Sequence, residues 1–292
     1  MVTDRWIELP GRNLTLHVRE WVSNPIPERT PFLLVHGLAS NARTWDQVAA
    51  LLAQAGHAVF AVDQRGHGLS EKPDDGYDFP TVTADLAALL DALEIDRVLL
   101  IGQSWGGNVV LAFGARYPER VQGLGFIDGG YLDLQLRTDG SWEAVARDLK
   151  PPSLAGIPAA DMLIRMQNFH PEWSEDGVQG TMANFEVLPD GTIRPWLTLE
   201  RHMRILRTLW EQQPSALYPQ IAAPVYIAVA EQADEAEWLA LKRRQVAAAE
   251  AGLAQVAVEW FPATDHDIHV HRPEALATSL LTHHSRGIWS HQ

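Results

Sequence analysis

The most constraining feature of the sequence is the stretch of residues 98–107, in which four apolar residues lead directly into a Gly-x-Ser-x-Gly pattern. A continuous apolar run of this kind is typical of a strand buried on both faces of a sheet. Residues 108–117 predict a helix that stops before Pro118. We therefore expect a sharp strand-to-helix turn with Ser104 at its tip, where the two glycines of the pattern let the arms of the turn approach. Such a turn holds a serine hydroxyl exposed above a helix N-terminus.

Strands and helices alternate along the chain on both sides of this turn. Further buried strands are expected at residues 32–35, 58–62, 121–127, 225–230 and 256–261, and further helices at residues 44–54, 83–94, 235–251 and 274–282. Residues 5–9 and 14–21 predict an antiparallel pair at a sheet edge, since apolar and polar side chains alternate in the second of them. The alternation predicts an α/β fold, with a mostly parallel twisted sheet and helices on both faces.

The alternation is interrupted between residues 131 and 219, where prolines and tryptophans gather. Helices are expected there at residues 142–149, 159–169 and 198–211, and Pro189-Asp190-Gly191 predicts a hairpin turn. We therefore expect a core domain of residues 1–130 and 220–292 and a cap, or lid, of residues 131–219. Its aromatic and aliphatic residues predict an apolar acyl pocket. The alternative is a second structural subdomain, with those side chains as its own core.

Residues able to support catalysis follow five of the predicted strands. The candidates are Ser104, Asp128, Asp234 and His266, together with the segment His36-Gly37-Leu38, whose useful group is a backbone N–H. Open α/β sheets bind ligands beyond the carboxyl ends of their strands. We therefore expect these residues to meet at one edge of the sheet.

Three histidines, His266, His269 and His271, compete for the role of general base. His266 is favoured because it comes first after the last strand, whereas the other two fall where the chain turns into the final helix. We expect His36 to brace its own loop rather than to act in catalysis. The polar residues of segment 63–70 are expected to satisfy buried backbone groups in the same way.

The chain resembles the α/β-hydrolase fold superfamily in four motifs. They are His36-Gly37-Leu38, Asp63-x-Arg65-Gly66-His67-Gly68-x-Ser70, Gly102-x-Ser104-x-Gly106-Gly107, and a late histidine followed by Pro273-Glu274. The resemblance covers nearly everything except the interrupted segment. It implies a Ser–acid–His triad in that chain order. It also implies an oxyanion hole formed by the backbone N–H groups of Leu38 and Trp105.

The resemblance leaves the acid open between Asp128 and Asp234. Most of the superfamily carries it in the loop that holds Asp234, but Ala230 replaces the usual glycine here and one extra residue precedes the carboxylate. Some members, certain haloalkane dehalogenases among them, place the acid at the end of the strand that Asp128 follows. The two glycines after Asp128 let the chain bend away and leave its carboxylate facing the histidine. We favour Asp128 and keep both candidates.

A serine nucleophile with these partners predicts acyl transfer to water, with Ser104 attacking a carbonyl and His266 taking its proton. Related haloalkane dehalogenases and epoxide hydrolases carry Asp in place of this serine, so those activities are disfavoured. We expect carboxylic ester hydrolysis of a small to medium apolar substrate. Carbon–carbon bond hydrolysis, lactone opening, aminopeptidase or amidase action and cofactor-free peroxidation use the same triad. A ligand receptor or signalling partner with a slow triad is the alternative of another class.

Composition limits the partners of the chain. The net charge of −14 disfavours nucleic acid and anionic membranes, because phosphate binding needs a basic face. The absence of cysteine excludes disulfides and thiol nucleophiles. With no signal region and no apolar run of about 20 residues, we expect a soluble cytoplasmic enzyme that acts on a small molecule without a cofactor or metal. The sequence leaves the oligomeric state open. His283, His284 and His291 predict a solvated tail without metal-site spacing.

Overall fold

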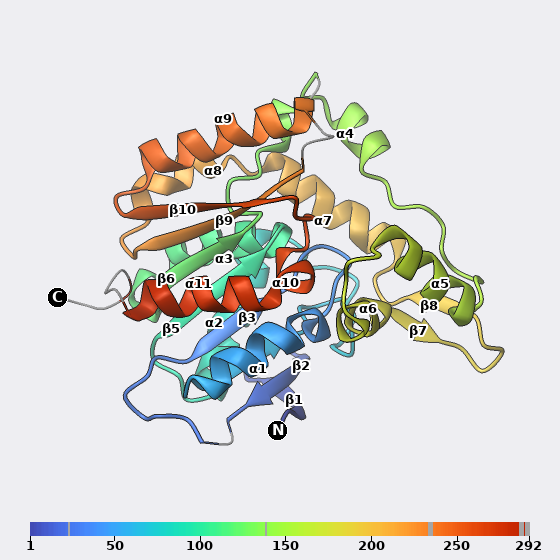
Figure 1. Ribbon diagram of the computed structural model, residues 1–292, viewed down its shortest axis with the longest axis horizontal. Coiled ribbons are helices and arrows are strands. Elements are labelled where there is room, and N and C mark those ends of the chain that lie inside the picture. Colours follow the sequence, from blue (N-terminus) through green and yellow to red (C-terminus); the bar gives the residue numbers. More distant parts are fainter. Residues whose placement is uncertain (23, 138, 233–235, 286–288, 290–292) are drawn as a thin grey trace.

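The structure, a computed structural model, describes residues 1–22, 24–137, 139–232, 236–285 and 289. Its centre is an eight-stranded sheet in the order β1-β2-β4-β3-β5-β6-β9-β10 (Figure 1). β1 and β2 pair antiparallel, as do β2 and β4, and the other neighbours run parallel. The predicted mostly parallel sheet is confirmed. Its strands are β1 (Thr3–Leu9), β2 (Leu14–Trp21), β3 (Phe32–Val35), β4 (Val59–Val62), β5 (Val98–Gln103), β6 (Val121–Ile127), β9 (Val225–Glu231) and β10 (Val256–Pro262).

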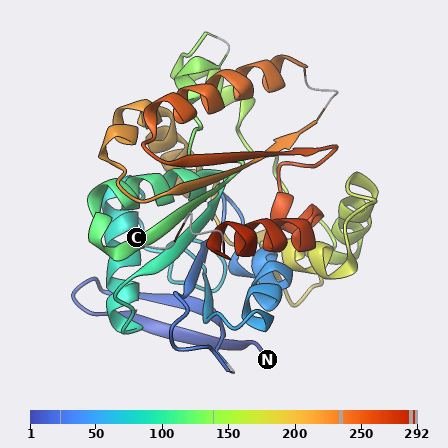
Figure 2. The same ribbon diagram turned by 60° about the vertical axis from the view of Figure 1, so that its left-hand side comes forward.

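Helices cover both faces of the sheet (Figure 1 and Figure 2). Each layer of helices packs on its own cluster of buried apolar side chains, so the sheet is the middle of three layers. Strands β3, β4 and β5 are buried along their whole length, as expected for apolar runs between two helical layers. One layer contains α2 (Phe79–Ala92), α3 (Trp105–Arg116) and α9 (Ala236–Gly252), and the other contains α1 (Asp46–Gln54) and α11 (Pro273–Ser285).

Two helices begin earlier than expected. α2 begins at Phe79 rather than at residue 83, because the Asp78 side chain accepts a hydrogen bond from Thr81 N (2.8 Å) and a proline suits the first turn. α3 begins at Trp105 rather than at residue 108, so the last two glycines of the Gly-x-Ser-x-Gly-Gly pattern lie in its first turn. Outside the segment between β6 and β9, the described residues also form the short helices η1 (Ala42–Trp45), η2 (Pro118–Arg120) and α10 (Ile268–His271).

The predicted solvated tail is wrong for two of its three histidines. His283 and His284 lie in α11, which extends to Ser285. The His283 ring centroid lies 4.4 Å from that of Tyr226, and the His284 ring lies 4.8 Å from that of His57. Both side chains are half-buried and contact the core, so they are not part of a fully solvated tail. His291 lies outside the described residues.

Within the insertion between β6 and β9, the segment from α4 to β8 lies beyond the carboxyl ends of the strands in Figure 1, whereas α8 packs beside α3 and α9. The predicted hairpin turn joins β7 to β8, which pair antiparallel. No helix was expected at residues 175–182, where α6 (Glu175–Met182) begins with a turn capped by the Ser174 side chain. The division into core and cap domains at residues 131 and 219 stays a prediction. The elements of the insertion are η3 (Leu134–Leu136), α4 (Trp142–Asp148), α5 (Ala159–Phe169), α6 (Glu175–Met182), β7 (Phe185–Val187), β8 (Ile193–Pro195), α7 (Leu199–Glu211), α8 (Pro214–Leu217) and η4 (Tyr218–Gln220).

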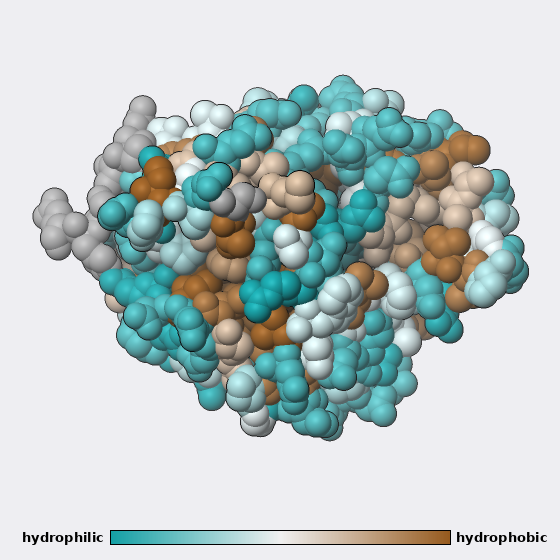
Figure 3. All heavy atoms as spheres, turned by 90° about the horizontal axis from the view of Figure 1, so that it is seen from below, coloured by the Kyte–Doolittle hydropathy of each residue, from teal (hydrophilic) through white to brown (hydrophobic). Residues whose placement is uncertain are grey.

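The face drawn in Figure 3 is mainly hydrophilic, with separate hydrophobic patches. Exposed apolar side chains of the insertion include Ile164, Phe169 and Val187. Within the described ranges, every helix is too short or too polar to traverse a lipid bilayer.

Candidate active site

Ser104 occupies the sharp turn that the glycine pattern predicts, between β5 and α3. Its φ of 53° and ψ of −123° lie in a region that residues with a side chain rarely adopt. The turn is fixed on both sides, since Ser104 N donates to Ile127 O (2.9 Å) and Ser104 O accepts from Gly107 N (2.9 Å). A Cβ at Gly102 would collide with the Gly106 carbonyl, and a Cβ at Gly129 with the carbonyl of Ser104 itself. The glycines therefore permit the turn and its contact with the β6 loop.

Asp128 directly follows β6 and is 1% exposed. Its Oδ1 accepts hydrogen bonds from Tyr131 Oη (2.5 Å) and Ala230 N (3.1 Å). Its Oδ2 accepts from Lys242 Nζ (2.9 Å) and His266 Nδ1 (2.6 Å). Burial raises the pKa of this carboxyl, but the hydrogen bond and charge of His266, followed by the charge of Lys242, outweigh burial and hold the pKa below its usual value. Asp128 is therefore ionised around neutral pH.

His266 lies in the loop between β10 and α10, and its side chain is 44% exposed. Burial of part of the ring lowers its pKa, but the hydrogen bond and charge of Asp128 raise it more, and the pKa lies above its usual value. Because Asp128 engages Nδ1, Nε2 is the ring nitrogen left to accept a proton. The backbone of this loop is also held by Gln103 at the end of β5, whose Nε2 donates to His266 O (3.4 Å).

The other candidate bases lie in different surroundings. His269 is fully buried against Trp45, with ring centroids 4.4 Å apart, and burial lowers its pKa to about 3. His271 Nδ1 accepts from Asp265 N (3.0 Å), and its Nε2 lies 3.1 Å from a carboxylate oxygen of Glu172. His266 is the candidate that the structure brings to Asp128. Asp234, the other candidate acid, lies outside the described residues.

The loop that carries Leu38 is held by two buried histidines. His36 Nδ1 donates to Gly37 O (2.7 Å) while its Nε2 accepts from Gln64 N (3.0 Å), so both ring nitrogens serve the backbone. His67 Nε2 accepts from Ala39 N (3.3 Å), and its ring stacks on Trp105 with centroids 5.5 Å apart. These contacts fix the two segments whose N–H groups were predicted to form an oxyanion hole.

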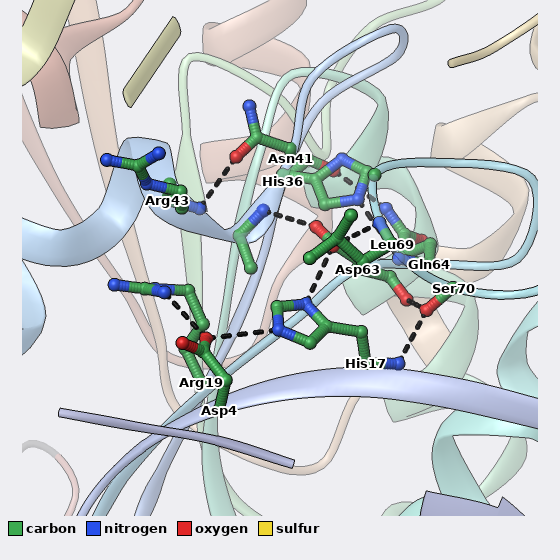
Figure 4. Close-up of polar contacts among 12 residues, drawn as sticks. Asp4, His17, Arg19, His36, Asn41, Arg43, Asp63, Gln64, Leu69 and Ser70 are labelled. Carbon is green, nitrogen blue, oxygen red and sulfur yellow. Dashed lines mark hydrogen bonds and ion pairs between the residues drawn. The ribbon is translucent and has the colours of Figure 1, made fainter. Parts of the chain in front are cut away.

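Below this loop, the segment 63–70 forms a buried network around Asp63 (Figure 4). Asp63 Oδ1 accepts from Ala42 N (2.7 Å), and Oδ2 accepts from Leu69 N and His17 Nδ1 (both 2.8 Å). Burial raises the pKa of this carboxyl, but the hydrogen bond from His17, the charges of His36 and His17 and the hydrogen bond from Leu69 N outweigh burial and lower the pKa to about 2. The carboxylate satisfies backbone groups around it, as predicted for this segment.

A cavity of about 1210 Å³ opens at the carboxyl edge of the sheet, and Ser104, His266, Leu38 and Trp105 all line it. Helices α7 and α9 form two of its walls. Most of the wall is apolar: Leu132, Leu134, Leu136, Leu149, Leu206, Leu209, Trp238, Ala240 and Leu241. Its titratable or charged lining residues, besides His266, are Arg137, His202, Glu237 and Arg244.

The insertion also contacts the loop that carries His266. Asp265 Oδ2 accepts from His170 Nδ1 (3.0 Å) and Trp173 Nε1 (2.9 Å), both from the insertion. Gln232 Nε2 donates to its Oδ1 (3.0 Å). Among the residues that the structure describes, no group of three His, Cys, Asp or Glu side chains is arranged to hold a metal ion.

Sequence reasoning missed two partners of Asp128, namely Tyr131 and Lys242. Lys242 carried a detectable signal, because it falls on the buried face of α9 with Leu241, Gln245 and Val246. A lone lysine among buried positions of a helix indicates a buried acidic partner. Tyr131 follows Asp128 by three residues but gave no such signal.

The family profile described as alpha/beta hydrolase fold matches residues 30–192, which is more than half of the chain. The chain therefore belongs to the alpha/beta hydrolase fold family, as its motifs indicated.

Curated relatives match only part of the chain. The 2-(acetamidomethylene)succinate hydrolase of Mesorhizobium japonicum is 36% identical over 115 residues, 39% of each chain. The 2-hydroxy-6-oxo-2,4-heptadienoate hydrolase of Pseudomonas putida is 36% identical over 113 residues, 38% of this chain and 41% of that protein. The non-heme chloroperoxidase of Streptomyces lividans is 40% identical over 92 residues, 31% of this chain and 33% of that protein. The match spans 28% to 41% of the length of such relatives.

Solved structures resemble nearly the whole chain. An E-2-(acetamidomethylene)succinate hydrolase has a TM-score of 0.76 at 24% identity, covering 97% of this chain and 98% of that one. The thioesterase domain from the curacin biosynthetic pathway has a TM-score of 0.71 at 19% identity, covering 96% and 99%. These likenesses show the fold, and they include the region of the insertion.

Proposed function

We propose that this chain is a serine hydrolase that cleaves a carboxylic ester through an acyl-enzyme on Ser104, with His266 as general base and Asp128 as the acid of the triad. The observation that carries the proposal is the 2.6 Å contact of buried Asp128 with His266 Nδ1, on a histidine that lines the same cavity as Ser104. The proposed nucleophile, base and orienting acid thus lie at the same carboxyl edge of the sheet.

In the proposed reaction, the Ser104 hydroxyl attacks the ester carbonyl as His266 Nε2 takes its proton. The N–H groups of Leu38 and Trp105 donate to the developing oxyanion, each contributing about 3 kcal/mol by analogy with other oxyanion holes. The alcohol leaves with the proton from His266, and water then repeats the cycle to release the acid. Asp128 holds the imidazole tautomer and stabilises the imidazolium, because its own carboxylate is kept ionised.

The cavity supports a substrate with an apolar acyl group. Leu206 and Leu209 of α7 belong to residues 131–219, and they line the cavity together with Trp238 and Leu241 of α9. We propose that residues 131–219 act as the cap that shapes this pocket. A remote apolar part of a substrate would then be bound by the cap, while the reacting carbonyl is held at the sheet edge.

A second candidate is hydrolysis of a carbon–carbon bond in a substrate that carries a carboxylate. The observation that favours it is the presence of Arg137 and Arg244 in the cavity lining of a chain whose net charge is −14. The Arg137 guanidinium lies 4.6 Å from the centroid of the Trp238 ring, which orients it. Two of the relatives are named for carboxylate substrates, a heptadienoate and a succinate derivative.

The experiment compares p-nitrophenyl butyrate with p-nitrophenyl hemisuccinate, whose acyl chain ends in a carboxylate, and with a 2-hydroxy-6-oxo-dienoate. Multiple turnovers of the butyrate ester support the first proposal. A preference for the dienoate over both esters favours the second. Failure of Ser104→Ala to abolish either reaction contradicts both, because both need the serine.

A further inference from the structure

The least expected group at the candidate site is the ammonium of Lys242. Lys242 lies on α9 and is 4% exposed. Its Nζ donates to Asp128 Oδ2 (2.9 Å) and to Ala230 O (2.8 Å), and it lies 5.9 Å from the centroid of the Trp238 ring. Burying an ammonium is costly unless it is paired. The side chain is therefore committed to one carboxylate, and to the same oxygen that His266 uses.

We propose that Lys242 is a positioning residue that sets the basicity of His266, because its positive charge offsets the negative charge of Asp128. Its role in catalysis rests on the proposed function, whereas its effect on the histidine does not. Without Lys242, the negative charge of Asp128 would favour protonated His266 more strongly. Less of the neutral imidazole would then be present in mild acid. With Lys242 present, the histidine faces a carboxylate–ammonium pair of zero net charge, and it stays available as a base to lower pH.

The physical reason is the short distance at which the three groups meet. Lys242 Nζ and His266 Nδ1 lie 2.9 Å and 2.6 Å from the same oxygen, Asp128 Oδ2. The ammonium therefore repels the imidazolium that forms when His266 is protonated. Because Asp128 and Lys242 are both almost fully buried, such repulsion is screened less than between groups at the surface. The same contacts hold the carboxylate oxygens in place, since Tyr131 and Ala230 N occupy Oδ1.

Other charged or titratable groups near His266 act differently. Asp267, next to it in the chain, raises the pKa of His266 by its charge, but less than Asp128 does. Asp265 is paired with His170. Burial lowers the pKa of His269 to about 3 and that of His202 to about 4, so these two histidines are neutral around neutral pH. Arg137, Glu237 and Arg244 line the cavity, where solvent screens them. Lys242 is the cation that contacts Asp128 Oδ2.

The test is the pH dependence of kcat/KM for the wild type, Lys242→Met and Lys242→Arg. Methionine removes the charge at similar volume, and we expect the acid limb to move to higher pH. At about pH 5, kcat/KM as a fraction of its plateau should fall about 10-fold below the wild-type fraction. Lys242→Arg keeps the charge, so its limb should stay at the wild-type pH even where its plateau rate is lower.

A second readout does not depend on turnover. The imidazole C2–H signal of His266, identified by its absence in His266→Gln, should titrate at higher pH in Lys242→Met. If the wild type shows no hydrolysis, the proposed function fails while this titration still decides the inference. A folded Lys242→Met in which the signal titrates at the wild-type pH overturns it. A shift of equal size in Lys242→Arg overturns it too, because geometry rather than charge would then be responsible.

Should Lys242→Met fail to fold, the comparison is made between Asp128→Asn and Asp128→Asn/Lys242→Met. Replacing a buried ion pair by neutral groups is far better tolerated than removing one partner. Lys242 would lie unpaired beside His266 in the single variant, so we expect the His266 signal to titrate at higher pH in the double variant. Equal titration in these two variants would contradict the inference.

Discussion

Two buried aspartates contact a histidine at the carboxyl edge of the same sheet, and only one of them belongs to the candidate site. Asp63 follows β4 and lies 2.8 Å from His17 Nδ1, whereas Asp128 follows β6 and lies 2.6 Å from His266 Nδ1. Both carboxyls have a lowered pKa despite burial, because hydrogen-bond donors outweigh the cost of burial. The chemistry of the pair alone therefore does not distinguish a scaffold from a catalytic site.

The histidines differ in what surrounds them. The side chain of His17 is 2% exposed, and its second nitrogen lies 3.0 Å from Asp4 (Figure 4). The side chain of His266 is 44% exposed and lines the cavity beside Ser104. A histidine bonded at both nitrogens can only hold structure, whereas one that is oriented at Nδ1 and open at Nε2 can move a proton. Matched substitutions in the two pairs should therefore have different effects, on stability for Asp63 and His17 and on turnover for Asp128 and His266.

The largest expected effect is that of Ser104→Ala. We expect ester turnover to fall by about 10⁴- to 10⁶-fold, by analogy with removal of other serine nucleophiles. We expect Tm to change little, because the Ser104 side chain lines the cavity and adds little packing. Turnover of p-nitrophenyl butyrate and the site of phosphonate labelling measure this. Labelling of the variant at the wild-type rate would refute the role of Ser104.

Next in size is His266→Ala, with His17→Ala as its matched control. We expect a loss of turnover of about 10⁴-fold or more for His266→Ala with a nearly unchanged Tm. His17→Ala should instead lower Tm, because it leaves the Asp63 carboxylate without a charged partner. His269→Ala should also act mainly on stability, through the cavity it leaves beside Trp45. Thermal melts and turnover are measured together. A larger kinetic loss for His269→Ala than for His266→Ala would reverse the assignment of the base.

Asp128→Asn and Asp63→Asn apply the same change to the two acids. Asp128→Asn should lower turnover by up to about 10⁴-fold, as the analogous change does in a protease triad. Asp63→Asn should leave the rate within a few-fold and reduce the free energy of unfolding by about 3 kcal/mol. If Asp128→Asn keeps near wild-type turnover while Asp234→Asn does not, the acid is Asp234.

The free energy of unfolding should depend less steeply on pH in the Asp63→Asn variant than in the wild type. The folded-state pKa of Asp63, about 2, lies below that of an unfolded aspartate, so its contribution is present above about pH 4 and is lost as pH falls toward 2. The wild type should therefore lose stability over this range more steeply than Asp63→Asn. Urea unfolding at several pH values gives both slopes, and parallel slopes would mean that Asp63 carries no depressed pKa.

The features predicted best from the sequence are those that depend on residues close together in the chain. The turn at Ser104 follows from glycines within five positions, and each central strand follows from its own apolar run. The partner of His266 was harder to choose, because two of the groups that hold Asp128 come from distant elements, Ala230 on β9 and Lys242 on α9, and only Tyr131 is close in sequence. No pattern within one segment of the sequence indicates that groups from distant segments contact the same carboxylate. His283 and His284 were misplaced for the same reason, since their partners Tyr226 and His57 are far away in the sequence.

The smallest expected effect concerns the cap, and it tests whether residues 131–219 bind the remote part of the substrate. Leu206 is 1% exposed in the wall of the cavity, on α7, and it lies away from the groups that act on the carbonyl. Leu206→Ala should lower kcat/KM for p-nitrophenyl octanoate by about 10-fold relative to that for the acetate, because a lost apolar contact of this size contributes about 1–3 kcal/mol to transition-state binding. Leu52→Ala, in α1 on the other face of the sheet, removes the same atoms far from the cavity and serves as the control. Equal losses for the two esters in Leu206→Ala would mean that the cap supports the fold without choosing the substrate.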